Sequence, residues 1–129
     1  MPQVLFVCMG NICRSPTAHV VFREQVRERG LSDQLMIDSA GTHDFHRGKQ
    51  PDVRAIETAA KQGLDMTDLR ARQVQKHDFE RFDYVVAMDS ENLSALQNSC
   101  PEAYLARLSL LLDWTDGWGT EVPDPYYGG

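Results

Sequence analysis

The residues best suited to chemistry are crowded near the amino terminus of this chain. Cys8, Gly10, Asn11 and Arg14 lie within seven consecutive positions, after four apolar residues and just before Ser15-Pro16-Thr17. Five residues separate the thiol from the guanidinium, which lets backbone N–H groups curl around an anion of phosphate size. A strand, a tight loop and a helix N-terminus commonly bind such anions. The stretch therefore predicts a phosphate-binding loop with a thiol at its mouth.

Each residue type in this loop suits a separate task. Gly10 permits a close backbone approach, and Asn11 tolerates a left-handed conformation while its amide braces the loop from inside. Arg14 offers a planar fork that matches two phosphate oxygens. The positive field of the N–H groups and Arg14 favours the thiolate of Cys8, which can attack phosphorus without a histidine base. Ser15 could donate a hydrogen bond to that thiolate and help it to leave.

Simpler interpretations exist for these residues. A cysteine at a strand end is usually a small buried apolar residue, and Cys-x5-Arg also occurs by chance. The conjunction of strand, Cys8, Gly10, Asn11, Arg14 and a helix start favours the catalytic interpretation. Phosphoryl transfer through cysteine also needs an acid for the leaving oxygen. The best candidate is Asp124, held between two prolines, although Asp-Pro is also a common turn starter.

The elements that must position these residues alternate between strands and helices. The predicted strands are 4–7, 35–37, 83–88 and 108–112, and the predicted helices are 15–30, 51–63, 77–82 and a helix from Ser90 that ends before Pro101. Ser15 and Ser90 are the expected helix caps, and 43–50 is the expected surface loop. This order predicts an α/β sandwich with a parallel sheet, whose ligands lie beyond the carboxyl ends of the strands.

Composition narrows the class of protein. With 129 residues, 42% hydrophobic and 25% charged, the chain fits one globular domain, 1–129. A net charge of −6 argues against nucleic-acid and anionic-membrane partners. No apolar run has the length of a membrane span, and no secretion signal is expected. Three cysteines without framework spacing favour a reducing compartment, the cytoplasm.

Two motifs at opposite ends of the chain carry a family resemblance. The segment 8–16, together with Asp124-Pro125-Tyr126-Tyr127-Gly128, resembles the low-molecular-weight protein tyrosine phosphatases. The resemblance runs from about residue 3 to the last residue and includes 38–42, Arg72-Gln73 and 82–89. It implies the phosphotyrosine protein phosphatase I-like fold, a three-layer α/β sandwich in which helices flank a four-stranded parallel sheet.

The resemblance also implies the roles of the site residues. Cys8 is the expected nucleophile, Arg14 the phosphate clamp and Asp124 the general acid and then base. The remaining expected substrate-binding residues are Met9, Gly10, Asn11, Ile12, Cys13 and Ser15 in the loop, with Ser39 as loop support and Phe45, Tyr126 and Tyr127 as aromatic walls. No metal or cofactor is expected. The expected substrate is a phosphotyrosine-containing protein, and a tyrosine kinase is one candidate by analogy.

Several alternatives stay open at this point. Cys13 corresponds to a family cysteine that forms a reversible disulfide with the nucleophile, but it could equally pack as a small side chain. Many relatives carry a histidine that braces the loop asparagine where this chain has Leu69, so support for Asn11 could instead come from Ser39. Relatives also continue beyond the Asp-Pro-Tyr motif into a final helix, whereas this sequence ends at Gly129; either the sequence is truncated or a partner replaces that helix. A thioredoxin-coupled arsenate reductase of the same fold is the alternative function, ranked lower because Cys100 alone cannot complete the redox relay.

Overall fold

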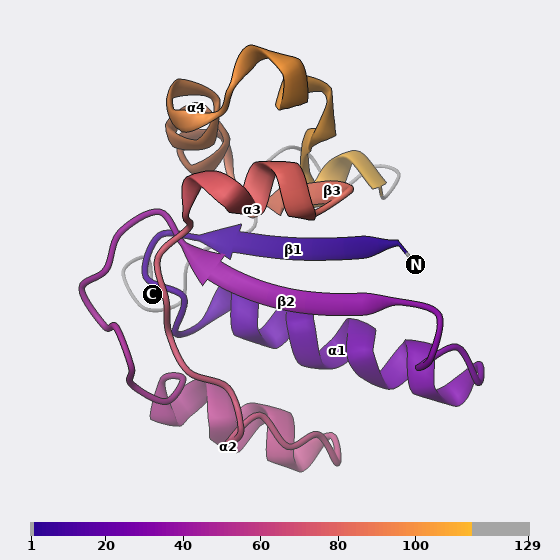
Figure 1. Ribbon diagram of the computed structural model, residues 1–129. Helices are drawn as coiled ribbons and strands as arrows, with labels where there is room; N and C mark the ends of the chain where they lie inside the picture. Colours follow the sequence, from indigo (N-terminus) through magenta and orange to yellow (C-terminus); the bar gives the residue numbers. More distant parts are fainter. Residues whose placement is uncertain (1, 115–129) are drawn as a thin grey trace.

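The computed structural model describes residues 2–114, which fold around a four-stranded parallel sheet (Figure 1). Its strands are β1 (Gln3–Cys8), β2 (Met36–Gly41), β3 (Tyr84–Ala87) and β4 (Leu108–Leu110), in the order β2-β1-β3-β4. The helices are α1 (Arg14–Glu28), α2 (Val53–Lys61), α3 (Lys76–Arg81) and α4 (Ser90–Ser99), with the 3-10 helices η1 (Glu102–Arg107) and η2 (Leu111–Trp114). The predicted α/β sandwich with a four-stranded parallel sheet is confirmed.

The central strand β1 supplies apolar side chains to both faces of the sheet. Leu5 and Val7 belong to one buried cluster with Phe79, Phe82 and residues of β3, α4 and β4. Val4, Phe6 and Cys8 belong to a second cluster that includes Phe22 of α1. Because successive side chains of a strand point to opposite faces, the uninterrupted apolar run of β1 requires helices on both sides.

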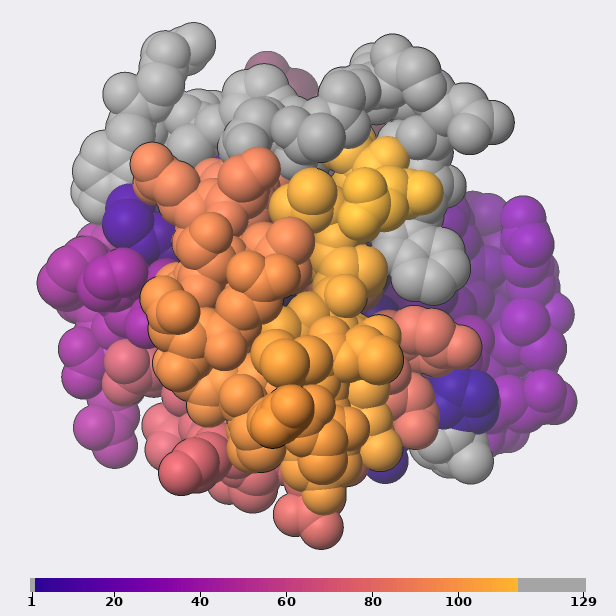
Figure 2. All heavy atoms as spheres, turned by 90° about the horizontal axis from the view of Figure 1, so that it is seen from above, coloured from indigo at the N-terminus to yellow at the C-terminus, as the bar shows by residue number. Residues whose placement is uncertain are grey.

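The helices form the two outer layers that this pattern demands. Figure 1 shows α1 and α2 on one side of the sheet and α3 and α4 on the other. Seen from the second side, α4 and the chain through η2 cover the centre of the molecule (Figure 2). The helix α2 reaches the core through α1, because Ala55 and Ala59 pack with Cys13 and Val20.

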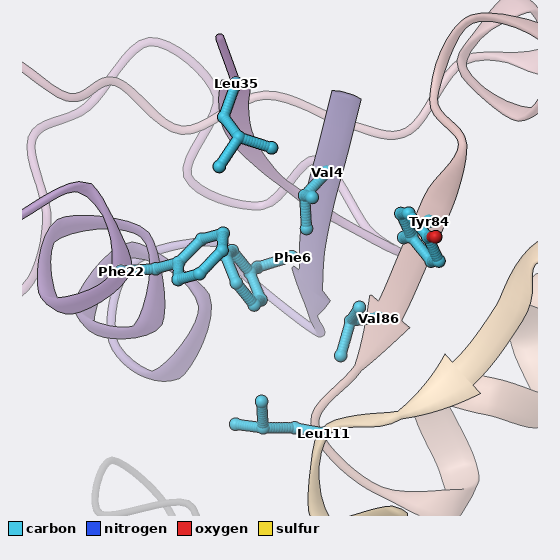
Figure 3. A pocket seen from close by; sticks show the side chains of 7 residues that line it. All are labelled: Val4, Phe6, Phe22, Leu35, Tyr84, Val86 and Leu111. Atoms are coloured by element: carbon cyan, nitrogen blue, oxygen red, sulfur yellow. The ribbon is translucent and has the colours of Figure 1, made fainter. Parts of the chain in front are cut away.

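The face that carries α1 also holds an apolar cavity of about 320 Å³. Figure 3 shows its lining side chains, contributed by α1, by the sheet and by its flanking segments: Val4, Phe6, Phe22, Leu35, Tyr84, Val86 and Leu111. Phe6 and Phe22 meet edge to face, with ring centroids 5.8 Å apart. The cavity therefore lies against β1 and β3 on the face of the sheet that carries α1.

Two predicted helix caps are wrong. Cys13 occupies the N-cap position of α1, and Ser15 lies inside the first turn, where its hydroxyl serves the phosphate loop. Asp89 caps α4 in place of Ser90, since its carboxylate accepts from the N–H of Asn92 at 2.7 Å. Capping signals identify a helix start to within a residue or two, and tertiary contacts choose the cap itself.

Two predicted strands also differ in length. The strand predicted at 35–37 continues to Gly41, because every residue of β2 from Met36 to Gly41 pairs with β1. The strand predicted at 108–112 ends at Leu110, and the chain then turns into η2. Polar residues within β2 hid its extent, since they lie at the carboxyl edge of the sheet where the site is built.

Candidate active site

The predicted phosphate loop connects β1 to α1 at the carboxyl edge of the sheet. β1 pairs with β2 on one side and with β3 on the other, so the strand order reverses at this position. In open parallel sheets ligands bind at such a switch point. Asn11, Ile12, Cys13, Arg14 and Ser15 are all buried. The loop is therefore a packed part of the fold.

The Cys8 thiol lies at the base of this loop and receives two polar contacts. The backbone N–H of Asn11 donates to Cys8 Sγ at 3.2 Å. Ser15 Oγ lies 3.0 Å from Sγ, and either atom can be the donor. Donors aimed at sulfur stabilise a thiolate more than a thiol. The single hydroxyl hydrogen of Ser15 can be donated to the sulfur, as predicted, or to Ala40 O, which lies 3.4 Å from Oγ.

Asn11 adopts the left-handed conformation that its type allows. Its φ is 57°, the only positive φ among the described non-glycine residues. Its side-chain Nδ2 donates to Ser15 Oγ at 2.9 Å, and its Oδ1 accepts from the backbone N–H of Arg72 at 3.0 Å. Asn11 thus braces the loop from inside, and its second anchor lies 61 residues further along the chain.

The loop is also fixed from outside by close backbone contacts. A Cβ on Gly41 would lie 2.7 Å from Met9 O and 3.2 Å from Asn11 N, and a Cβ on Gly10 would lie 3.0 Å from the His46 ring. The N–H of His43 donates to Met9 O at 3.0 Å. Within residues 2–114, the N–H groups of Gly10 and Ile12 have no protein acceptor. Loop N–H groups without a protein acceptor suit the binding of an anion.

Arg14 begins α1 and is held by a carboxylate from the neighbouring strand end. Its Nη1 donates to Asp89 Oδ2 at 2.8 Å, and its side chain is only 5% exposed. The same carboxylate caps α4, so Asp89 links the phosphate clamp to the end of β3. The sequence reasoning missed this role. Its signal was the position of Asp89 directly beyond the strand beside β1.

The expected support from Ser39 takes a different route. Ser39 is buried, and its Oγ lies 3.1 Å from His19 Nδ1. Among residues 2–114 no hydrogen bond joins its side chain to Asn11, and the role of Ser39 as loop support stays a prediction. Leu69, at the position of the missing histidine, packs instead on the apolar cluster of α1 and α2.

His19 is therefore a buried histidine that the sequence reasoning did not single out. Burial and the nearby charge of Arg23 lower the pKa of His19, and the carboxylates of Asp38 and Asp68 oppose this shift. A lowered pKa favours the neutral imidazole, which can share a hydrogen with the Ser39 hydroxyl. The sequence signal that could have identified His19 was its place in the predicted helix, shortly after Ser15 and Pro16.

All three cysteines are free thiols. Cys13 is buried among Val20, Ala55, Ala59 and Met66, which agrees with the packing interpretation. A disulfide between Cys13 and Cys8 stays a prediction. Cys100 packs against the opposite face of the sheet from Cys8, and burial raises the pKa of its thiol against the opposing charge of Arg107.

The expected surface loop, which we name the wall loop (residues 43–50), lies beside the phosphate loop, since the N–H of His43 donates to Met9 O. Phe45 is 62% exposed, and its ring stacks on the His43 ring with centroids 5.0 Å apart. Phe45 is thus available as one aromatic wall. The other predicted wall residues, Tyr126 and Tyr127, and the predicted acid Asp124 lie outside the described residues.

Two further features are absent from residues 2–114, a metal site and a membrane-spanning helix. Among these residues, no group of three or more His, Cys, Asp or Glu side chains is placed to hold a metal ion. None of their helices combines the length and the apolar character of a membrane span.

Comparisons with known proteins agree with this geometry. The model of the family described as low molecular weight phosphotyrosine protein phosphatase matches residues 3–129. The low molecular weight phosphotyrosine protein phosphatase of Schizosaccharomyces pombe is 45% identical over 98% of this chain and 82% of that protein. The YfkJ protein-tyrosine-phosphatase of Bacillus subtilis is 40% identical over 100% of this chain and 83% of that protein.

A solved structure extends the agreement to three dimensions. A crystal structure of a protein tyrosine phosphatase from Entamoeba histolytica superposes with a TM-score of 0.94 at 41% identity, over 100% of this chain and 83% of that one. The predicted family, fold and enzyme class, a protein-tyrosine phosphatase, are confirmed. This chain belongs to the low molecular weight phosphotyrosine protein phosphatase family.

Proposed function

We propose that the protein hydrolyses phosphotyrosine in proteins through a phosphocysteine on Cys8. The Cys8 thiolate attacks phosphorus, an S–P bond forms, and the P–O bond to the phenol breaks. Asp124 gives its proton to the departing phenolate. Asp124 then takes a proton from water, whose oxygen attacks phosphorus and releases inorganic phosphate and the Cys8 thiolate. Arg14 binds the equatorial phosphate oxygens, and Asp89 orients it.

One observation carries this proposal: two groups near the start of α1 lie within hydrogen-bond distance of Cys8 Sγ. The Asn11 N–H at 3.2 Å and the Ser15 hydroxyl at 3.0 Å both reach the sulfur. They stabilise the thiolate as attacking group and again as leaving group, because sulfur carries negative charge at both stages. The buried Arg14 begins the same helix.

The aromatic wall supports tyrosine as the phosphorylated residue. Phe45 offers an exposed ring beside the loop, and Tyr126 and Tyr127 are the proposed opposite wall. A phenyl ring fills a slot between aromatic walls, whereas a phosphoserine is too short to reach them. A tyrosine kinase is one candidate protein substrate, and the free thiols support action in a reducing compartment, the cytoplasm.

The arsenate reductase alternative receives less support. A redox relay needs a second thiol that can reach the nucleophile. Cys100 belongs to the cluster on the opposite face of the sheet, and its Sγ donates to Pro101 O at 3.3 Å. Cys13 is nearer in sequence but is packed between α1 and α2. Hydrolysis needs only the one thiol of Cys8.

The deciding experiment measures p-nitrophenyl phosphate turnover with and without vanadate, beside thioredoxin-coupled arsenate reduction. We expect turnover that vanadate inhibits, and no arsenate-dependent oxidation of thioredoxin. A phosphotyrosine peptide and the matched phosphoserine peptide then test the substrate class. Arsenate reduction without phosphate release would overturn the proposal, and equal rates on the two peptides would overturn its tyrosine specificity.

A further inference from the structure

The position of the Asn11 backbone determines one of the two donors to the nucleophile. Asn11 has a φ of 57°, and its N–H donates to Cys8 Sγ at 3.2 Å. An L-residue in this region is retained only where its surroundings hold it. Whatever holds Asn11 therefore also holds the donor that faces the sulfur.

One of the anchors of Asn11 comes from a segment without regular structure. Its Oδ1 accepts from the backbone N–H of Arg72 at 3.0 Å. Arg72 lies between α2 and α3, where an isolated bridge between Gly41 and Gln73 is the local pairing. The N–H of Gly41 donates to Arg72 O at 2.8 Å, so both backbone groups of Arg72 face the site. Backbone hydrogen bonds that join Ala71, Arg72 and Val74 to Gly41, Gly48 and Lys49 hold this segment in part.

Two carboxylates also hold the segment around Arg72, because they bind the Arg72 side chain. The guanidinium donates to Asp78 through Nη1 and Nη2, at 2.9 and 3.2 Å, and to Asp38 through Nε and Nη2, at 3.3 and 3.1 Å. Asp78 is 1% exposed and also accepts from the N–H of Gln75 at 2.7 Å. Burial opposes the charge of Arg72, but the bonds to Asp78 and the charge of Asp38 outweigh it and raise the pKa of Arg72.

We propose that Asp38 and Asp78 are positioning residues for phosphoryl transfer, acting on Cys8 through Arg72 and Asn11. We name Asp38, Arg72 and Asp78 the carboxylate clamp. The two carboxylates hold the guanidinium in place, the Arg72 N–H holds the Asn11 amide, and the Asn11 N–H then meets the sulfur. The charged groups of the clamp contact neither the sulfur nor the phosphate loop; only the Arg72 backbone N–H does so, at Asn11. The inference rests on the proposed role of Cys8 as nucleophile.

The test compares Arg72→Met with Arg72→Lys, which keeps the charge but loses the planar fork. The matched control is Arg27→Met, which removes the exposed ion pair with Glu24 at the far end of α1. Each variant is measured for p-nitrophenyl phosphate turnover and for the rate of Cys8 alkylation by iodoacetamide at neutral pH.

We expect kcat of Arg72→Met to fall by about 10- to 100-fold, because a displacement of about 1 Å near reacting groups has effects of this order. Alkylation of Cys8 slows in the same variant, since the thiolate loses a well-placed donor. Arg72→Lys recovers part of both rates, and Arg27→Met leaves both unchanged. Unchanged kcat and unchanged alkylation in Arg72→Met would overturn the proposal.

A double variant separates positioning from general loosening. In an Asn11→Ala background the path through the Asn11 amide is already cut, so adding Arg72→Met should lower kcat much less than it does in the wild type. The same fold loss in both backgrounds would overturn the proposal. If Arg72→Met fails to fold, Asp38→Asn carries the same comparison, because its side chain is 35% exposed.

Wild-type measurements keep this inference separate from the proposed function. Absence of turnover in the wild type would contradict the phosphatase activity. Alkylation needs no turnover, so the dependence of Cys8 reactivity on Arg72 still reports on the clamp. The two failures are thus distinguishable.

Discussion

The phosphate loop and the wall loop lie side by side at one edge of the sheet but are built in opposite ways. The phosphate loop is buried from Asn11 to Ser15, and its polar side chains bond within the fold. The wall loop is largely exposed, and Phe45 is an exposed residue whose ring stacks on that of His43. Both loops rest on one segment, since Ala71 exchanges backbone hydrogen bonds with Gly48 and Lys49, while Arg72 holds Asn11.

The contrast separates chemistry from recognition. The reacting sulfur needs donors fixed to within a fraction of an ångström, and packing with second-layer hydrogen bonds provides that. The ring of a substrate needs an apolar surface that tolerates some adjustment, and an exposed loop provides it. Changes in the phosphate loop should therefore affect kcat, and changes in the wall loop should affect KM.

Replacing Cys8, the proposed nucleophile, is the most severe test of the division between chemistry in the phosphate loop and recognition in the wall loop. Cys8→Ser should lower turnover of p-nitrophenyl phosphate by about 10⁴-fold or more, the scale on which loss of a nucleophile acts. The thermal unfolding midpoint should change little, because the hydroxyl occupies a similar volume. A matched Cys100→Ser variant should keep full activity. Substantial turnover by Cys8→Ser would contradict the mechanism.

The proposed general acid, Asp124, lies outside both loops in the sequence, so its loss should have a different signature. Asp124→Asn should slow substrates with poor leaving groups by about 10²- to 10⁴-fold, the usual contribution of acid catalysis. Substrates whose phenolate leaves without a proton should be affected less. The check is kcat across a series of aryl phosphates of different phenol pKa. A uniform loss across that series would remove Asp124 as the acid.

The left-handed residue of the phosphate loop offers an intermediate test. Asn11→Ala loses two side-chain hydrogen bonds and places alanine at positive φ, so the free energy of unfolding should fall by about 1–3 kcal/mol. Asn11→Gly loses the same bonds but tolerates the backbone angle, so its loss should be smaller. Denaturant unfolding measures both, with the exposed Asn98→Ala as control. Equal losses in the Ala and Gly variants would exclude a contribution from the backbone angle.

The wall loop should give a smaller effect, confined to aromatic substrates. Phe45→Ala should raise KM for a phosphotyrosine peptide by roughly 2- to 10-fold, the worth of one aromatic contact. We expect kcat to stay near the wild-type value and an alkyl phosphate to show no change. The exposed Val53→Ala serves as control. A fall in kcat without a change in KM would place Phe45 in the chemistry and break the contrast.

The smallest expected effect is on the pH dependence of folding stability. It involves His19, whose ring contacts Ser39 near the phosphate loop. The folded pKa of His19 is lowered mainly by burial, so the unfolded chain binds a proton at higher pH than the folded one. The contribution of His19 to the stability of the folded state is therefore complete above the ordinary histidine pKa of about 6.5. It is lost as the pH falls through the lower pKa of His19 in the folded protein. His19→Gln should flatten the dependence of stability on pH below about 6.5. Parallel wild-type and His19→Gln curves would exclude this role.

The local sequence was sufficient for the elements that depend on neighbouring residues. The apolar run of β1, the turn residues Gly10 and Asn11 and the start of α1 near Ser15 all follow from local rules. The left-handed conformation of Asn11 and the parallel sheet followed from the same reasoning, because residue type and hydrophobic period act over short distances.

The tertiary structure decided which distant groups meet at the loop. Asp89 meets Arg14 across 75 residues and Arg72 meets Asn11 across 61, while the Ser39 hydroxyl meets His19 rather than Asn11. It also chose Cys13 and Asp89 as helix caps in place of Ser15 and Ser90. A side chain with several possible partners binds the one that packing brings to it, and that choice depends on the whole fold. The sequence alone thus pointed to the proposed nucleophile and its loop, and the fold determined what holds them in position.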